Sequence, residues 1–253
     1  MATDSTIKLT AHDGHTFSAY RADPAETPKG AIIVLPGETN AEGKIRKLAD
    51  GFAASGYLVI APALSQPTVP AQPEGDGSED KPASDPTAPL FAEIQSTVDS
   101  VSDCGKIALV GYGAGGGLAY TAANRVTGLA CAISYYGTGI VENAGAKRKI
   151  PTLLHFGEAD PVVPFTEVGQ FRAYHPEVSA FSYPGVAHDF DDDGASYDET
   201  ASKLAHERTM TWISQYVVGQ PPIALKNAGA YALAKTDKKK KKKADDDMGP
   251  PMD

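Results

Sequence analysis

The segment Gly111-Tyr112-Gly113-Ala114-Gly115-Gly116 decides the fold of this chain. It follows an apolar, β-rich run at residues 107–110 and opens a small-residue stretch that predicts a helix. This order is typical of a nucleophile elbow, a sharp strand-to-helix turn with the pattern Gly-x-nucleophile-x-Gly that lifts a Ser or Cys above a sheet. The nucleophile slot holds Gly113, and glycine has no side chain that could attack a carbonyl carbon. The sequence therefore predicts the backbone of such a site without its reacting atom.

Strand-like and helix-like segments alternate along the rest of the chain. Near-continuous apolar strands that alternate with helices are typical of a mostly parallel sheet with helices on both faces. The expected fold class is therefore α/β, as a single domain. Asp13-Gly14 between two alternating runs predicts an antiparallel hairpin. The expected strands are 7–10, 16–20, 31–35, 57–61, 107–110, 130–135, 152–156 and 180–183, and the expected helices are 41–55, 89–101, 114–126, 165–174 and 197–217.

Length and low-complexity segments predict the domain organisation. The 253 residues fit one α/β domain of about 220 residues followed by a tail. We expect the domain at residues 1–218 and a disordered, lysine-rich tail at residues 219–253, where a run of lysines at 238–243 precedes aspartates at 245–247. Residues 65–89 are rich in Pro, Ser and acidic side chains. We expect them to form an acidic excursion that is poorly ordered or wraps over the mouth of the site.

Composition argues against several classes of protein. The net charge is −9, and the seven Lys and five Asp from Lys235 onward contribute +2, so the preceding residues carry −11. An acidic body argues against a nucleic-acid surface on the folded domain, because phosphate neutralisation dominates such binding. No run of about 18 apolar residues predicts a transmembrane helix. The N-terminal residues do not have the pattern of a signal peptide. Cys104 and Cys131 give no disulfide framework, and we expect a cytoplasmic location.

Two further candidate catalytic residues follow the elbow, each after a predicted strand. Asp160 comes after the strand at 152–156, and His188 comes after the strand at 180–183. The chain order nucleophile, acid, histidine is that of the α/β-hydrolase fold, and open α/β sheets build their sites at the carboxyl ends of the strands. Asp160 and His188 are therefore candidates for the acid and the base of a triad.

The chain resembles the dienelactone hydrolase family over about residues 5–217. This resemblance implies a single-domain α/β-hydrolase that opens lactones or esters through a Cys-His-Asp triad, without metal or organic cofactor. The similarity is carried by colinear segments: Asp13-Gly14-His15-Thr16-Phe17, Gly105-Lys106-Ile107-Ala108-Leu109-Val110-Gly111-Tyr112, Tyr135-Tyr136-Gly137, Gly157-Glu158-Ala159-Asp160, Ala187-His188-Asp189-Phe190 and Glu207-Arg208-Thr209.

The resemblance assigns roles to individual positions. The acid of the family falls on Asp160, the histidine on His188 and the cysteine on Gly113. The family also has an early glutamate that holds the resting thiol, and it pairs with Glu38 when the alignment is shifted by one residue from Gly37.

The implied oxyanion hole uses backbone N–H groups, from Ala114 and from a residue near Gly37 or Glu38. Such donors survive the loss of the nucleophile side chain.

The chain departs from the family where substrate is bound. The family binds its substrate carboxylate with arginines, but this chain has no arginine between Arg46 and Arg125. Aspartates stand at positions 189, 191, 192 and 193, directly after His188. We expect this acidic cluster to repel an anionic substrate, because like charges in a low-dielectric cleft are costly.

No other residue is a convincing replacement for the nucleophile. Cys131 lies within the strand at 130–135, where cysteine is typically a small buried hydrophobe. Cys104 precedes the elbow strand, at the end far from the site. The side chain of Tyr112, next to the vacant slot, is expected to point away from the cleft.

Three functions are left open by the sequence. The first is a hydrolase fold retained for binding or assembly, with a small ester-like ligand or with a protein partner that contacts the tail or the acidic excursion. The second is an active hydrolase whose nucleophile has been replaced by glycine in this sequence. The third is weak hydrolysis, in which His188, oriented by Asp160, activates a water above Gly113. The several departures together favour the first.

Overall fold

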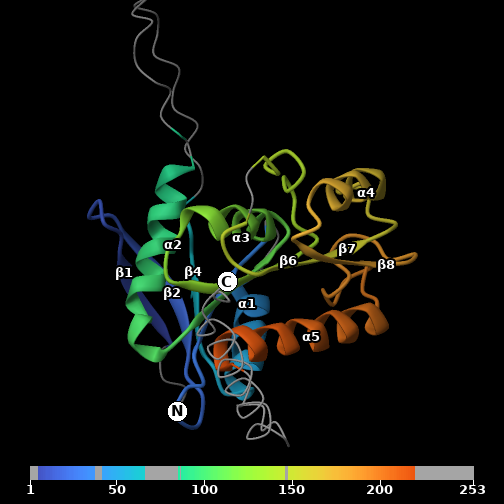
Figure 1. The fold of residues 1–253 in the computed structure, drawn as a ribbon. Coiled ribbons are helices and arrows are strands. Elements are labelled where there is room, and N and C mark those ends of the chain that lie inside the picture. The colour runs from blue at the N-terminus through green and yellow to red at the C-terminus, as the bar shows by residue number, and fades with distance from the viewer. Residues whose placement is uncertain (1–4, 38–41, 66–84, 86, 146–147, 220–253) are drawn as a thin grey trace, which may run out of the picture. The chain divides into compact units, whose positions relative to one another are not determined.

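The computed structural model of the protein describes residues 5–37, 42–65, 85, 87–145 and 148–219. Within them, an eight-stranded sheet has the strand order β1-β2-β4-β3-β5-β6-β7-β8 (Figure 1). The strands are β1 (Thr6–Thr10), β2 (Thr16–Ala22), β3 (Ala31–Leu35), β4 (Leu58–Pro62), β5 (Ile107–Tyr112), β6 (Leu129–Tyr135), β7 (Thr152–Gly157) and β8 (Ser179–Tyr183).

The described residues also form five α-helices, of which the first four connect strands and the fifth follows β8, with a short 3-10 turn η1 (Ser102–Cys104) and a π-helical turn η2 (Ser214–Val218) that continues the last helix. The helices are α1 (Glu42–Ala54), α2 (Ala88–Ser100), α3 (Ala114–Arg125), α4 (Phe165–Tyr174) and α5 (Glu199–Ile213).

Strand directions confirm the predicted α/β class. β1 and β2 form an antiparallel pair, and β2 joins the sheet antiparallel to β4. All the remaining neighbours pair in parallel. Every predicted strand and helix is present, and most ends lie within two residues of the expected ones. Residues 220–253 of the predicted tail, and residues 66–84 and 86 of the predicted acidic excursion, lie outside the described residues.

The helices cover both faces of the sheet because successive side chains of a strand point to opposite faces. On β3, Ile32 and Val34 pack in the cluster that includes residues of α1 and α5. Ile33 and Leu35 pack in the cluster that includes residues of α2 and α3. All five residues of β3 are buried, as expected for a central strand of a sheet that is covered on both sides.

Strand pairing determines which loops meet at the site. β3 and β5 pair in parallel with Leu35 opposite Gly111, and β5 and β6 pair with Tyr112 opposite Tyr135. The segments that follow β3, β5 and β6 therefore leave the sheet side by side. β7 and β8 lie next in the strand order, so their ends are brought to the same edge.

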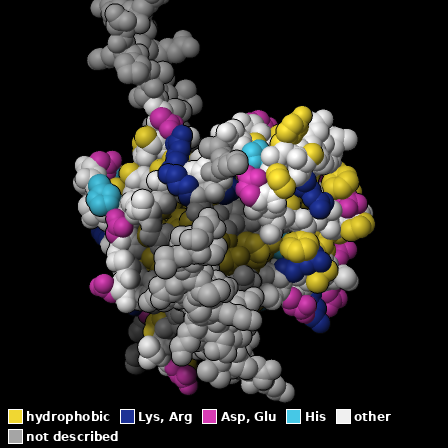
Figure 2. Space-filling view, viewed as in Figure 1, with side chains coloured by type: hydrophobic (Ala, Val, Ile, Leu, Met, Phe, Trp, Pro, Cys, Tyr) yellow, Lys and Arg dark blue, Asp and Glu magenta, His cyan; other side chains and the backbone are white. Residues whose placement is uncertain are grey.

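None of the helices in the described part of the chain is both long enough and apolar enough to cross a membrane. Figure 2 shows acidic and basic side chains interspersed on the face that it presents.

Candidate active site

Gly113 lies between β5 and α3 in the strained backbone conformation of a sharp strand-to-helix turn. Its φ is 52° and its ψ is −121°, a combination that residues with a Cβ rarely adopt. The Gly113 N–H donates to the Tyr135 carbonyl at 3.0 Å, and the Gly113 carbonyl accepts from the N–H groups of Gly116 at 2.9 Å and Thr138 at 3.1 Å. Backbone hydrogen bonds therefore hold the turn without any side chain at position 113.

The flanking glycines of the motif are required by packing, but Gly113 is not. A Cβ on Gly111 would overlap the Gly115 carbonyl, and a Cβ on Gly115 would overlap the Pro36 carbonyl. A Cβ on Gly113 would lie 3.6 Å from Gly37 Cα and 4.0 Å from Tyr136 Cε2, which are ordinary van der Waals contacts. Packing therefore leaves space for a Cβ at position 113, and the positive φ is what disfavours a side chain there.

Asp160 and His188 are joined as the acid and histidine of a triad are. His188 Nδ1 lies 2.6 Å from Asp160 Oδ2, and the Asp160 side chain is fully buried. Asp160 Oδ1 accepts from the N–H groups of Val162 at 2.7 Å and Val163 at 3.0 Å. A carboxylate held in this way orients the ring and fixes its Nδ1–H tautomer, so that Nε2 is the basic nitrogen. The structure thus brings together two of the residues predicted from sequence.

Tyr136 connects the elbow with His188. Its ring centroid lies 4.9 Å from that of His188, and its Cε2 borders the space above Gly113. Its hydroxyl donates to Asp191 at 2.5 Å. Among the described residues, Tyr136 and Asp189 are the two non-glycine residues with positive φ, at 38° and 54°. Strained backbone of this kind clusters at functional sites, and here one such residue packs against the histidine ring and the other follows it in the chain.

The acidic cluster after His188 is mostly paired with other parts of the protein. Asp192 forms an ion pair of 3.0 Å with Lys44, and Asp193 pairs with Lys47, both on α1. Asp191 is buried against Tyr136, and that burial raises the pKa of its carboxyl. Asp189 Oδ1 lies 3.9 Å from His188 Nε2. Lysines of α1 therefore pair with two of the four aspartates, and the expected repulsion of an anionic substrate by this cluster stays a prediction.

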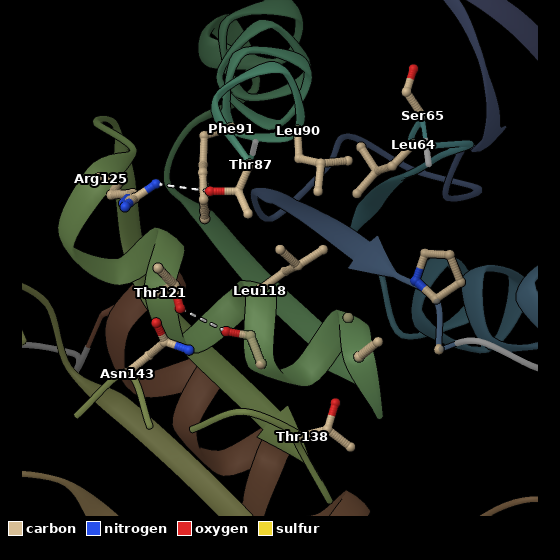
Figure 3. A pocket seen from close by; sticks show the side chains of 15 residues that line it. Leu64, Ser65, Thr87, Leu90, Phe91, Leu118, Thr121, Arg125, Thr138 and Asn143 are labelled. Atoms are coloured by element: carbon tan, nitrogen blue, oxygen red, sulfur yellow. Dashed lines mark hydrogen bonds between the residues drawn. The ribbon is translucent and has the colours of Figure 1, made fainter. Parts of the chain in front are cut away.

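A cavity of about 420 Å³ begins at the elbow and runs between α2 and α3 (Figure 3). Gly37 and Ala114, the predicted sources of oxyanion-hole N–H groups, both line it. Ala114 is the first residue of α3, so its N–H has no acceptor within the helix and lies at the positive end of the helix dipole. His188 and Asp160 are not among the described residues that line this cavity. Glu38, the predicted partner of a thiol, lies outside the described residues.

The remaining candidate nucleophiles are buried or distant. Burial raises the pKa of the Cys131 thiol to about 12, and burial also raises the pKa of Tyr112 well above its usual range. Cys104 lies in η1, at the opposite end of β5 from the elbow. His155 is a structural histidine, because burial lowers its pKa to about 3 and its ring contacts the hydroxyls of Tyr183 and Thr209.

Sequence reasoning missed Arg125 as a site residue. Its guanidinium reaches the cavity, donates to Asp85 at 2.6 Å and lies 4.6 Å from the ring centroid of Phe91. The signal available in the sequence was helical spacing, since Arg125 falls on the same face of the predicted helix as Ala114, Leu118 and Thr121.

Comparison with known proteins gives the family. The sequence profile of the dienelactone hydrolase family matches residues 17–217. The chain belongs to the dienelactone hydrolase family. A relative in this family is the carboxymethylenebutenolidase of Pseudomonas putida, which is 26% identical over 225 residues that cover 82% of this chain and 95% of that protein. The carboxymethylenebutenolidase 1 of Cupriavidus pinatubonensis is 27% identical over 227 residues, covering 81% of this chain and 94% of that protein.

Solved structures of esterases share the fold of this dienelactone hydrolase family member. A thermophilic esterase of Thermogutta terrifontis, with propionate bound, superposes with a TM-score of 0.64 at 15% identity, covering 87% of this chain and 98% of that one. Within the described residues, no group of three or more His, Cys, Asp or Glu side chains is arranged to hold a metal ion.

Proposed function

We propose that this member of the dienelactone hydrolase family binds a neutral ester-like ligand without forming an acyl-enzyme. The observation that carries the proposal is Gly113 at the elbow, in the backbone conformation of a nucleophile but without a reacting atom. Covalent catalysis needs an activated side chain at this point. In a serine protease the loss of the triad nucleophile costs about a millionfold in kcat.

A second candidate function is weak hydrolysis by activated water. It is favoured by the intact His188–Asp160 pair and by the unfilled space above Gly113. Water there could be deprotonated by His188 Nε2 and attack a carbonyl whose oxygen is held by the Ala114 N–H. This route would retain only the roughly thousandfold acceleration over water that binding and an oxyanion hole supply.

Release of p-nitrophenol from p-nitrophenyl butanoate separates these functions. The proposal predicts no burst of p-nitrophenol from the unmodified protein, and at most a slow linear release. If that slow release is lost in His188→Ala, the second candidate function, hydrolysis by water that His188 activates, is supported. A burst of one equivalent per protein would overturn the proposal. Gly113→Cys serves as the positive control for a burst.

The proposal includes a cytoplasmic location and a protein partner for the charged tail or the acidic excursion. Cys104 and Cys131 are both free thiols, which fits a reducing compartment. The charge-segregated sequence at residues 238–247 would bind an acidic partner through its lysines. Such binding should weaken as salt is added.

A further inference from the structure

The cavity beside the elbow is a groove along one face of α3. Ala114, Leu118, Thr121 and Arg125 all line it, at helical spacings of four, three and four residues. With a rise of about 1.5 Å per residue, the groove follows the helix for about 16 Å. One end carries the N–H of Ala114, and the other end carries the guanidinium of Arg125.

The middle of the groove is apolar. In Figure 3, Leu64, Leu90 and Leu118 project toward one another from the segment after β4, from α2 and from α3. Phe91 continues this wall toward Arg125. Apolar walls with a few polar groups at fixed points are the usual construction of a small-molecule site, and 420 Å³ falls within the usual size of one.

Polar side chains in the wall already donate to acceptors within the protein. The Ser65 hydroxyl donates to Glu93 at 2.5 Å, and the Thr121 hydroxyl donates to the Gly117 carbonyl at 3.0 Å. Asn143 Nδ2 donates to the Gly139 carbonyl at 2.7 Å. A ligand in this groove would therefore meet these three side chains with their printed donors already engaged, and apolar contacts along the middle of its length.

The charge of Arg125 is balanced by Asp85. Arg125 Nη1 lies 2.6 Å from Asp85 Oδ2 and 3.1 Å from Thr87 Oγ1. Hydrogen bonds from the Thr87 hydroxyl and N–H, and then from Arg125, lower the pKa of Asp85 to about 2. Asp85 thus stays ionised near neutral pH, and an anionic ligand would have to compete with it for the guanidinium.

We infer that this groove binds an extended, uncharged acyl chain, with its carbonyl at the elbow and its far end at the Arg125–Asp85 pair. The inference rests on the proposed function and names its ligand class, a neutral medium-chain acyl compound. The groove would discriminate against a chain that ends in a carboxylate, because the only cation lining it among the described residues already has a carboxylate partner.

Binding of unreactive amides to the full chain tests the inference. Butanamide, hexanamide, octanamide and dodecanamide are titrated by calorimetry, beside the monoamide of dodecanedioic acid, which ends in a carboxylate and is long enough to approach Arg125 from the elbow. We expect each added methylene to tighten binding about fourfold, as burial of about 0.8 kcal/mol per methylene requires. We expect the carboxylate-ended amide to bind at least tenfold more weakly than dodecanamide. Affinity that is independent of chain length, or a preference for the carboxylate, would overturn the inference.

Variants locate the binding in the groove. Leu118→Trp and Thr121→Phe fill it and should weaken dodecanamide binding at least tenfold, and the second variant decides the matter if the first does not fold. Leu204→Trp is the matched control, since Leu204 is also a partly buried leucine but packs in the cluster of the opposite sheet face. Equal binding by all four proteins would place the ligand elsewhere and refute the groove.

Asp85→Asn tests the role of the ion pair. Asparagine can keep the hydrogen bonds that Asp85 Oδ1 accepts from Thr87, while the charge that faces Arg125 is lost. The freed guanidinium should improve binding of the carboxylate-ended amide about three- to fivefold. An unchanged affinity would contradict the role given to this pair. Amides report on the groove whether or not an acyl-enzyme forms, so a burst with p-nitrophenyl butanoate would refute the proposed function and leave these results standing.

Discussion

The candidate active site has two halves, the Asp160–His188 pair and the elbow at Gly113, and they differ in which catalytic features are present. The Asp160–His188 half has both its side chains and its geometry, with a 2.6 Å hydrogen bond and a carboxylate held by two backbone N–H groups. The elbow half has the geometry alone, because Gly113 keeps the strained turn but carries no nucleophile. The comparison teaches that the turn is maintained by glycine packing and backbone hydrogen bonds, independently of the reaction that such a turn serves.

The largest expected effect is on esterase activity, when a nucleophile is placed at position 113 of the elbow. Gly113→Cys should create esterase activity on neutral esters such as p-nitrophenyl butanoate, since the histidine and the space for the thiol are in place. Adding His188→Ala to that variant should lower kcat/KM by about a hundredfold or more, the usual contribution of a general base. Activity of Gly113→Cys that does not depend on His188 would show that the two halves are no longer aligned.

The second prediction concerns the glycines of the elbow. Gly111→Ala places a Cβ against the Gly115 carbonyl, which cannot move without breaking the turn, so the free energy of unfolding should fall by about 4 kcal/mol or more. Gly113→Ala has room for its Cβ and should cost about 1–2 kcal/mol for the positive φ alone. Urea titrations of both variants measure the difference. Equal losses would mean that packing does not distinguish the two positions.

The third prediction concerns Tyr136, which lies between the halves. Tyr136→Phe removes the donor to buried Asp191 and should destabilise the protein by about 1–3 kcal/mol at neutral pH. The pKa of Asp191 is already raised by burial, and loss of a bond that lowers it should raise it further. A folded-state carboxyl pKa above the unfolded value means that stability falls as pH rises, so the penalty should be larger at pH 7 than at pH 4.

A matched tyrosine provides the control for that measurement. Tyr20 also donates to an aspartate, Asp50, but on the surface. Tyr20→Phe should cost less and show a smaller difference between the two pH values, because exposed hydrogen-bonding groups are satisfied by water. If the two variants respond alike, Asp191 does not carry the pH dependence.

The smallest expected effect is on the melting temperature, when the C-terminal residues outside both halves of the site are removed. Val217 in η2 is the last core residue of the described chain. Removing residues from Pro221 onward should leave the melting temperature unchanged, since this low-complexity segment offers little to a core. A markedly lower melting temperature, or aggregation, would show that residues 223–234 pack as part of the domain.

Local pattern was sufficient for the fold and for half of the site. The order of strands and glycine turns predicted that Asp160 and His188 would meet, because parallel strands end at one edge of a sheet. The structure confirms that meeting.

Ion pairs between residues that lie far apart in the sequence could not be predicted from local pattern. Arg125 pairs with Asp85, which lies 40 residues away in the sequence. Lys44 pairs with Asp192, which comes much later in the sequence. A run of aspartates beside the histidine looks uniformly repulsive in sequence, since nothing local shows that α1 supplies lysines to it. Residue type indicates charge, but the tertiary fold decides which charges are already compensated.

The central claim is most directly tested by intact-mass spectrometry of the unmodified protein after incubation with p-nitrophenyl butanoate. Gly113→Cys and His188→Ala are measured beside it, the first as the positive control and the second to recognise acylation that is unrelated to the site. The account predicts no butanoyl adduct on the unmodified protein and one adduct on Gly113→Cys, mapped to position 113. A stoichiometric adduct on the unmodified protein that disappears in His188→Ala would contradict the account, because it would reveal a nucleophile that serves this histidine.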